Sequence, residues 1–330
     1  MESNNRILPK LIAIVGPTGV GKTDLSEQII SYIDSEIVSI DSRQIYRKMD
    51  IGTAKPKSDL LNTVPHHLIN IVDPNDNFSI TDFLQSAKTS ISDIISRGKT
   101  PLLVGGTGQY FWSLIENWTI PSVPPNPELR KKFEQIANEY GAEHLFEELK
   151  SIDVEATKII DSRNIRRVIR ALEVGITGNK KWSELRSKDP ALYDPFIIGL
   201  TKDRTILYKD VDTRIDQMLN QGWIEEVRFL KNSNIDLTYP SMSSLGYDEI
   251  YNYLNKEVSI EYATDKIKIN THRFIRSQYN WFRISDTRIH WFDITVSGYS
   301  YQKQIKHLLE AFKLSSSQIF KAIVLTIPKI

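Results

Sequence analysis

Short apolar runs alternate with helical patterns over the first 120 residues of the chain. The runs have the length of buried strands and cover residues 11–15, 36–40, 67–72 and 101–104. Helical spacing lies between them, over 22–32 and most clearly over 80–97, where apolar residues recur every three or four positions. Strands that alternate with helices favour a parallel sheet with helices on its faces. The pattern therefore predicts an α/β fold.

A different pattern interrupts this alternation at about residues 121–195. The segment opens on a turn-rich break, PSVPPNP, and residues 128–187 are helical in pattern without β-rich runs. A further strand is then expected at 196–201, and long helices over 206–221, 223–232, 259–283 and 301–313. We therefore expect a core formed by residues 1–120 and 196–312, an all-helical insertion domain over 121–195, and a tail, 313–330, without an assigned role.

The composition excludes several classes of protein. The 330 residues include 40% hydrophobic residues, which is typical of a globular chain, and no cysteine, which excludes a disulfide scaffold, a thiol nucleophile and a Cys-ligated metal. The apolar runs are far shorter than the roughly 20 residues of a membrane span, so we expect a cytoplasmic protein without membrane contact. Nothing in the sequence requires a dimer, and a monomer is expected.

The strongest motif is a phosphate loop. Residues 16–23 fit G-x-x-x-x-G-K-[ST], follow an expected strand and open an expected helix, which is the context that the motif requires. Its N–H groups, the helix N-terminus and the lysine suit a diphosphate or a nucleotide, and the final hydroxyl suits Mg²⁺. The candidate phosphate ligands are Gly16, Pro17, Thr18, Gly19, Val20, Gly21, Lys22 and Thr23, and the candidate metal ligand is Thr23.

The expected strand at 101–104 ends without an acid. NTP-hydrolysing proteins with a phosphate loop usually carry a metal-binding Asp at such a strand end, whereas this strand is followed by Gly105-Gly106-Thr107-Gly108. The acid at a strand end is instead Asp41. Because ligands bind at the carboxyl ends of the strands in open α/β sheets, we expect Asp41, Thr107 and the phosphate loop to face one crevice. An Asp in this place can also cap a helix, and both roles stay open.

Charge is segregated along the chain although the totals, 42 Lys+Arg and 41 Asp+Glu, nearly cancel. Residues 141–155 sum to −4, residues 158–170 sum to +4, and residues 266–283 carry five Lys and Arg, several aromatic residues and no acid. The arginines at 163, 166, 167 and 170 share one face of an expected helix. They form either a solvated face that pairs with Glu173 and the acidic block or a surface for phosphate backbones. The aromatic residues in 266–283 can either stack on bases or pack in the core, and we expect each role on a different face of the helix.

Several motifs together resemble one family, the tRNA dimethylallyltransferases (tRNA isopentenyltransferases). The phosphate loop is followed by DSRQIYRKMDIGTAKP at 41–56, a long and specific match. Further similar stretches are Pro65-His66-His67, LVGGTG at 103–108, RALEV at 170–174, Leu245-Gly246-Tyr247 and Trp281-Phe282-Arg283. The resemblance spans about residues 9–312 and implies a P-loop core with a helical insertion that binds the tRNA anticodon stem-loop.

The resemblance implies an activity: transfer of the dimethylallyl group from dimethylallyl diphosphate to N6 of adenosine 37, 3′ of the anticodon, in tRNAs that read codons beginning with U. The expected cofactor is Mg²⁺, the expected catalytic residues are Asp41 as base with Lys22, Thr23 and Arg214, and ATP binding is implied by the phosphate loop motif alone. The alternatives are a small-molecule kinase and an enzyme that prenylates free AMP. An RNA-binding module without activity is disfavoured by the intact loop.

Residues for tRNA contact also follow from the resemblance. They are Asp41, Ser42, Arg43, Gln44, Thr107, Arg130, Arg166, Arg167, Val168, Ile169, Arg170, Met242, Ser243, Ser244, Leu245, Gly246 and Tyr247. The chain departs from the family pattern at Asn164, Arg166, Asp210, His272 and Ser277, where other residue types are frequent. These departures bear on tRNA affinity more than on the type of reaction.

Overall fold

The computed structural model of the chain describes residues 7–121, 123–178, 180–185, 187–295, 305, 309 and 310. The chain divides into two compact units: Met1–Ile115 together with Leu192–Ile330, and Glu116–Ala191. The second unit is therefore inserted into the first between a helix and a strand. The sequence predicted an insertion over 121–195.

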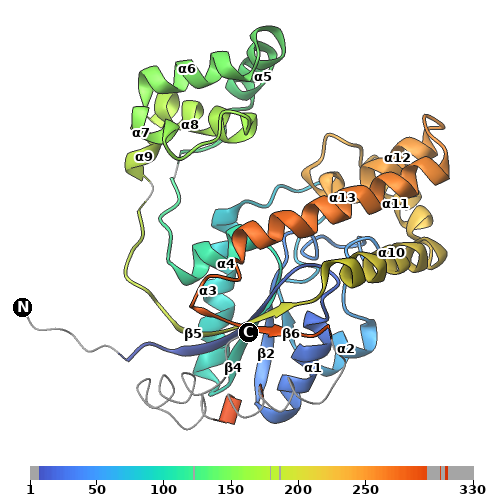
Figure 1. The fold of residues 1–330 in the computed structure, drawn as a ribbon. Coiled ribbons are helices and arrows are strands. Elements are labelled where there is room, and N and C mark those ends of the chain that lie inside the picture. Colours follow the sequence, from blue (N-terminus) through green and yellow to red (C-terminus); the bar gives the residue numbers. More distant parts are fainter. Residues whose placement is uncertain are drawn as a thin grey trace, which may run out of the picture. The chain divides into compact units, whose positions relative to one another are not determined.

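A sheet of six strands forms the centre of the first unit (Figure 1). The strands are β1 (Lys10–Val15), β2 (Ser35–Ile40), β3 (His66–His67), β4 (Thr100–Gly105), β5 (Asp194–Thr201) and β6 (Ile289–Asp293). Their order is β3-β2-β4-β1-β5-β6, and every pairing is parallel. The predicted α/β class is confirmed. Residues 11–15 of β1 are all buried because β1 lies inside the sheet and helices cover both faces.

Helices α1 (Lys22–Tyr32) and α3 (Ile80–Ser96) cover opposite faces of this sheet. The step from β1 to β2 runs toward the β3 edge, and the step from β3 to β4 runs back. Since parallel crossovers are right-handed, the two steps place their helices on opposite sides. Helix α2 (Ser58–Thr63) comes after the loop that follows β2, and helix α4 (Gly108–Ile115) comes after the loop that follows β4.

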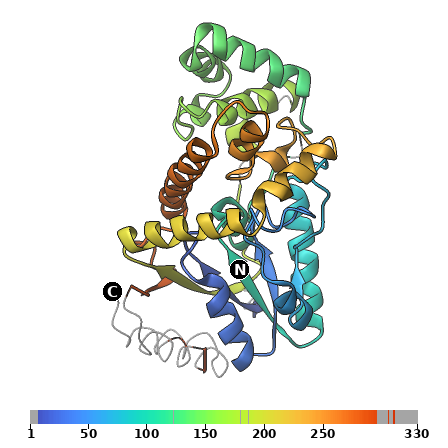
Figure 2. The same ribbon diagram turned by 90° about the vertical axis from the view of Figure 1, so that its right-hand side faces the viewer.

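A helical layer lies beside the carboxyl ends of the strands (Figure 2). It contains α10 (Arg204–Asn220), α11 (Trp223–Asn232), the 3₁₀ turn η1 (Pro240–Ser243), α12 (Tyr247–Leu254) and α13 (Ile260–Trp281). Trp223, Val227 and Tyr247 of this layer share one hydrophobic core with Ile45 and Met49 of the loop after β2. The layer therefore fixes the loops that leave the sheet.

The second unit is a small helical domain with its own core. Its helices are α5 (Pro127–Tyr140), α6 (Ala142–Ile152), α7 (Val154–Thr157), α8 (Ile165–Gly178) and α9 (Trp182–Leu185). Phe133, Leu145, Leu149, Val168 and Leu172 are buried together. Helix α8 contributes Val168 and Leu172 to this core from one face and carries Arg166 and Arg167 outside it, so it is strongly amphipathic.

Two strands differ from the sequence-based prediction, and helices α2, α4 and α12 were not predicted. The strand predicted over 67–72 is wrong: β3 has only two residues, since Leu68 and Asn70 adopt positive φ angles of 64° and 57° that end the extended run. Strand β6 was not predicted, because its sequence, IHWFD, carries little alternation. The helix predicted over 301–313 and the tail over 313–330 lie outside the described residues, apart from 305, 309 and 310.

Candidate active site

The phosphate loop connects β1 to α1 at the carboxyl edge of the sheet. Gly16 and Gly19 have φ angles of 144° and 81°, and a Cβ on them would lie 2.5 Å from the Leu200 carbonyl oxygen and 2.4 Å from a methyl of Val211. Only glycine therefore fits at these two positions. Helix α1 starts at Lys22 without a side-chain cap. Its first N–H groups consequently point into the loop, where an anion can accept from them.

Two half-buried cations face this loop. The Lys22 ammonium donates to the carbonyl oxygens of Gly16 (3.0 Å) and Pro17 (2.8 Å), and the Arg214 guanidinium on α10 donates through Nη2 to Thr18 Oγ1 (2.9 Å). Burial lowers the pKa of Lys22 to about 8; Asp41 opposes this shift and Arg214 adds to it. Burial also lowers the pKa of Arg214. Arg214 Nε is buried without a hydrogen-bond partner among the described residues. These cations suit an anionic ligand.

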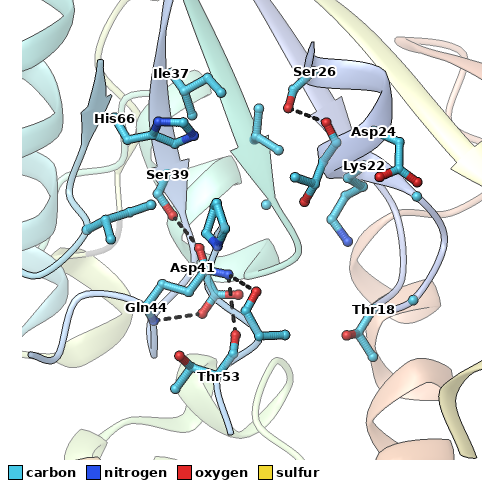
Figure 3. Close-up of a pocket in the computed structure, with 18 of the residues that line it drawn as sticks. Thr18, Lys22, Asp24, Ser26, Ile37, Ser39, Asp41, Gln44, Thr53 and His66 are labelled. Carbon is cyan, nitrogen blue, oxygen red and sulfur yellow. Dashed lines mark hydrogen bonds between the residues drawn. The ribbon is translucent and has the colours of Figure 1, made fainter. Parts of the chain in front are cut away.

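Asp41 follows β2 and lies across the hollow from the phosphate loop. Figure 3 shows Asp41 and Gln44 on the β2 side and Lys22 and Thr18 on the loop side. Asp41 Oδ1 accepts from the N–H groups of Arg43 (2.8 Å) and Gln44 (3.3 Å). One carboxylate oxygen thus holds the turn after β2. No helix begins at this turn, so Asp41 is not the helix cap that the sequence allowed; it stabilises a turn through Oδ1 and leaves Oδ2 for chemistry.

Two neighbouring hollows meet at Asp41. The first, of about 350 Å³, is lined by the phosphate loop, by Asp41 and by apolar side chains that include Ile37 and Val104. The second, of about 380 Å³, is lined by the loops after β2 and β4 and by the helical layer. Both hollows share the lining residues Thr18, Asp41, Thr53, Ala54 and Arg214. A group in the first hollow can therefore meet a group in the second beside the Asp41 carboxylate.

The second hollow gathers several residues predicted to contact tRNA. Ser42, Arg43, Thr107 and Leu245 line it, as do Ser243 and Ser244. Thr107 Oγ1 accepts from the Ser42 N–H at 3.1 Å, so the loops after β2 and β4 are joined, as the sequence predicted for one crevice. The Arg43 guanidinium donates to the Pro240 carbonyl oxygen (2.8 Å) and to Ser243 Oγ (3.1 Å), which ties the β2 loop to the segment that precedes α12.

Other residues predicted to contact tRNA have buried side chains. Met242 and Tyr247 are 1% and 0% exposed, and in the second unit Val168 and Ile169 belong to the hydrophobic core. Such side chains shape the backbone around them and have almost no surface to offer a nucleic acid. Their direct contact with tRNA stays a prediction.

The arginines of α8 fall into two groups. Arg170, with Arg130 of α5, pairs with the fully buried Glu173, and Arg170 also donates to the Val123 carbonyl oxygen at 2.8 Å. Arg166 is exposed, and the Arg167 guanidinium lies 5.5 Å from the centre of the Trp182 ring. The structure thus assigns Arg130 and Arg170 to the support of the domain, and it leaves Arg166 on the surface.

The departures at Asp210 and His272 also have structural partners. Asp210 lines the first hollow and pairs with Lys202 at 2.5 Å. The His272 ring stacks on Tyr208 and hydrogen-bonds to Asp212 at 2.9 Å. Ser277 lines the second hollow.

Sequence reasoning missed Gln278 of α13. Its side chain is 4% exposed; Oε1 accepts from the Thr18 N–H at 2.8 Å, and Nε2 donates to the Gly106 carbonyl oxygen at 3.0 Å. The amide therefore joins the phosphate loop to the β4 loop. The sequence carries no signal for this role, because Gln278 lies outside the motifs and its partner Thr18 is 260 positions away.

Comparisons with known proteins show which family the chain is similar to. The sequence model of the family described as IPP transferase matches residues 44–285. The chain is 46% identical over 274 residues to the tRNA dimethylallyltransferase of Chloroflexus aggregans, covering 83% of this chain and 93% of that protein. It is 41% identical to that of Bacillus cytotoxicus over 297 residues, covering 89% and 93%.

Solved structures give the same result. The crystal structure of the tRNA isopentenylpyrophosphate transferase of Bacillus halodurans superposes with a TM-score of 0.69 at 39% identity and covers 92% of this chain and 96% of that chain. A eukaryotic dimethylallyltransferase acting on tRNA shares the fold, with a TM-score of 0.75 at 24% identity and coverage of 92% and 79%. Among the helices that the structure describes, none has both the length and the apolar composition of a membrane span. The family match covers most of the chain, and the chain therefore belongs to the IPP transferase family.

Proposed function

We propose that the protein transfers the dimethylallyl group of dimethylallyl diphosphate to N6 of adenosine 37, immediately 3′ of the anticodon, in tRNAs that read codons beginning with U. The meeting of the two hollows at Asp41 carries the proposal. One hollow has the cationic loop and apolar wall that suit a prenyl diphosphate. The other has the polar loops and the exposed aromatic rings of Phe274 and Trp281 that suit a nucleobase turned out of its stack.

The proposed reaction is a displacement at the allylic carbon. The adenine N6 forms a bond to C1 of the prenyl group while the C1–O bond to the diphosphate breaks. N6 is a poor nucleophile because its lone pair is delocalised into the ring. We propose that the Asp41 carboxylate accepts the N6 proton as the bond forms, a step that typically contributes 10²- to 10⁴-fold in rate. The products are N6-dimethylallyladenosine and diphosphate.

Negative charge builds on the leaving diphosphate, and the phosphate loop suits its stabilisation. The N–H groups at the start of α1, the Lys22 ammonium and the Arg214 guanidinium converge on one hollow. Fixed donors in a water-poor site act strongly on developing charge. The buried Arg214 Nε, which has no partner among the described residues, supports a role for this guanidinium as a ligand of the diphosphate.

The proposed cofactor is Mg²⁺. Proteins usually hold Mg²⁺ through one or two side-chain oxygens together with substrate phosphates, rather than in a cage of many ligands. The first hollow fits this, because oxygen donors from Thr23, Asp24 and Asp41 line it. Bound there with the diphosphate, Mg²⁺ would neutralise charge on the leaving group.

The insertion is proposed to bind the anticodon stem-loop through the exposed face of α8. A kinase acting on a small molecule would leave this domain without a use, and the β4 end carries glycines where a kinase would need a metal-binding acid. An enzyme that prenylates free AMP would not need the insertion either.

The test is a transfer assay with the purified protein, Mg²⁺, dimethylallyl diphosphate and unmodified tRNA. The expected product is N6-dimethylallyladenosine at position 37, detected by mass spectrometry of nuclease digests, with AMP as a comparison acceptor that is not modified. Asp41→Asn should lower turnover at pH 7 by about 100-fold or more. Asparagine retains an oxygen that can hold the β2 turn, so binding of diphosphate and tRNA should persist.

The matched control is Asp59→Asn, an exposed carboxylate on α2 that lines neither hollow. It should keep full activity. Prenylation of AMP without prenylation of tRNA would reject the proposed acceptor, and full turnover by Asp41→Asn would reject the proposed base.

A further inference from the structure

The Glu226 carboxylate on α11 accepts four hydrogen bonds. Oε2 accepts from the backbone N–H groups of Asp50 (2.7 Å) and Ile51 (2.7 Å), and Oε1 accepts from the Gly52 N–H (3.1 Å) and from the Tyr247 hydroxyl (2.6 Å). Such hydrogen bonds to a charged acceptor are stronger than neutral ones. The carboxylate lies outside both hollows, so it does not touch a substrate bound there.

The backbone that Glu226 holds leads directly to the place where the hollows meet. Thr53 and Ala54, the next residues of the chain, line both hollows. Their carbonyl oxygens accept from Gln44 Nε2 at 3.3 and 3.2 Å. The Gln44 N–H in turn donates to Asp41 Oδ1. Hydrogen bonds, joined by the backbone of residues 52–54 and by the Gln44 side chain, therefore link Glu226 to the carboxylate at which the transfer is proposed to occur.

The fourth donor connects Glu226 to the opposite wall of the second hollow. Tyr247 is fully buried at the start of α12, and one residue, Gly246, separates it from residues 243–245, which line that hollow. Burial, and then the charge of Glu226, raise the pKa of Tyr247 well above its ordinary value, so the hydroxyl remains a donor. A Cβ on Gly52 would lie 2.1 Å from Trp223 Nε1 and 2.5 Å from the Tyr247 ring, so the loop packs closely against this wall.

We propose that Glu226 is a positioning residue that fixes the 50–54 loop and the 243–247 segment in one register, so that the acceptor base and the donor meet at Asp41. The four hydrogen bonds carry the inference, and the proposed effect on transfer rests on the proposed function. A carboxylate offers two oxygens to four donors. Glutamine offers one oxygen and one NH₂ group. Depending on its orientation, the NH₂ group would face the N–H donors of Asp50 and Ile51, or the donors of Gly52 and Tyr247, and could accept from neither pair.

The experiment compares Glu226→Gln with Glu225→Gln, a neighbouring glutamate whose side chain is 64% exposed and pairs with Arg228. In Glu226→Gln, amide hydrogen exchange over residues 50–52 should be faster by about tenfold or more, as expected when a hydrogen bond to a charged acceptor is lost. Exchange in the phosphate loop should not change. The kcat for transfer to tRNA should fall by about 10- to 100-fold, because misplacement of reacting groups by about 1 Å costs this much.

Binding of inorganic diphosphate separates positioning from a general loss of fold. Its Kd and its stoichiometry of one per chain should be the same in Glu226→Gln, Glu225→Gln and the unchanged protein. Tyr247→Phe removes one of the four donors and keeps the carboxylate, so it should give a smaller loss of kcat with the same pattern. It also provides the test if Glu226→Gln does not fold.

Two results would overturn the proposal. Unchanged exchange over 50–52 would show that Glu226 does not fix the loop, and this readout does not depend on any activity. If Glu226→Gln bound less than one diphosphate per chain, in proportion to its loss of turnover, Glu226 would maintain the fold and would not position the loop. Absence of transfer in the unchanged protein would instead reject the proposed function, and the exchange data would still decide the role of Glu226 in the loop.

Discussion

At the scale of single residues, the site depends on side chains that each serve two partners. Asp41 holds a turn through Oδ1 and faces both hollows. Lys22 donates to its own loop while it lies in the electrostatic field of Asp41 and Arg214. The ionisation of one group therefore affects the others, and the pH dependence of ligand binding reports on this coupling.

We predict that affinity for inorganic diphosphate falls as the pH rises through about 8. The pKa of Lys22 is lowered to about 8 by burial, so the ammonium is charged below this pH and loses its proton above it, earlier than an ordinary lysine. Calorimetry from pH 6.5 to 9.5 measures the effect. Lys22→Arg keeps its charge over this range and should lack the step, and subtraction of its profile removes the titration of diphosphate itself. Equal profiles for both proteins would contradict the prediction.

Sequence alone could predict the residues of the site that lie in contiguous motifs. Lys22, Asp41 and Thr107 follow strands whose carboxyl ends meet in a parallel sheet, so their proximity followed from topology. Gln278 and Glu226 could not be found in this way. Their partners, Thr18 and Gly52, are 260 and 174 positions away, and no spacing rule relates residues at such distances.

At the scale of elements, buried polar groups decide which helices stay together. Glu173 of α8 has a fully buried carboxylate that accepts from the Asn126 N–H (2.6 Å) and from Arg130 Nε (2.8 Å), and it pairs with Arg170. Burial alone would raise the pKa of Glu173, but these hydrogen bonds bring it below its ordinary value. The carboxylate thus joins α5 to α8.

We predict that Glu173→Ala destabilises the insertion domain by about 3–5 kcal/mol, because it leaves two arginines beside a buried site without their partner. Amide exchange in α5 and α8 measures the loss, and Glu134→Ala, an exposed glutamate of α5, is the control. In the unchanged protein the contribution of Glu173 is present above its unfolded pKa and is lost as the pH falls through its lower folded pKa. Equal stability of both variants would contradict this role.

The elements that sequence analysis placed well are those whose periodicity is long and regular. Helices α3 and α11 begin within a residue of the prediction, because apolar faces and caps mark them. The prediction of a strand over 67–72 was wrong for a local reason, because Leu68 and Asn70 adopt left-handed conformations that apolar patterning does not reveal. Strand β6 depends on pairing with β5, and this tertiary contact overrides its weak pattern.

At the scale of the whole molecule, a net charge of +1 conceals acidic and basic blocks. The two compact units carry different parts of the proposed function. The first holds both hollows, and the second holds the exposed Arg166 on α8. Changes on the exposed face of α8 should therefore alter tRNA binding and leave diphosphate binding intact.

We predict that Arg166→Ala weakens tRNA binding and reduces the slope of log K against log salt by about 0.7–0.9, the value for one lost phosphate contact. Diphosphate affinity should not change. Lys150→Ala, which removes an ammonium paired with Glu147 on α6, should leave the slope unaltered. Filter binding between 50 and 200 mM salt measures both, with the salt range chosen for sensitivity to counterion release. An unchanged slope for Arg166→Ala would contradict tRNA contact by Arg166 and would favour the interpretation of α8 as a solvated helix face.

The contact between Thr18 and Gln278 has a consequence for synthesis of the protein. The phosphate loop is synthesised well before the amide that holds its Thr18 N–H, which lies 260 positions later. Contacts of such long range form late in folding, because closing a long loop must precede them. A nascent chain that has only the motif therefore lacks the finished loop. Competence to hold a phosphate would be acquired once Gln278 has been synthesised and packed against the loop, so shorter chains would not sequester the donor.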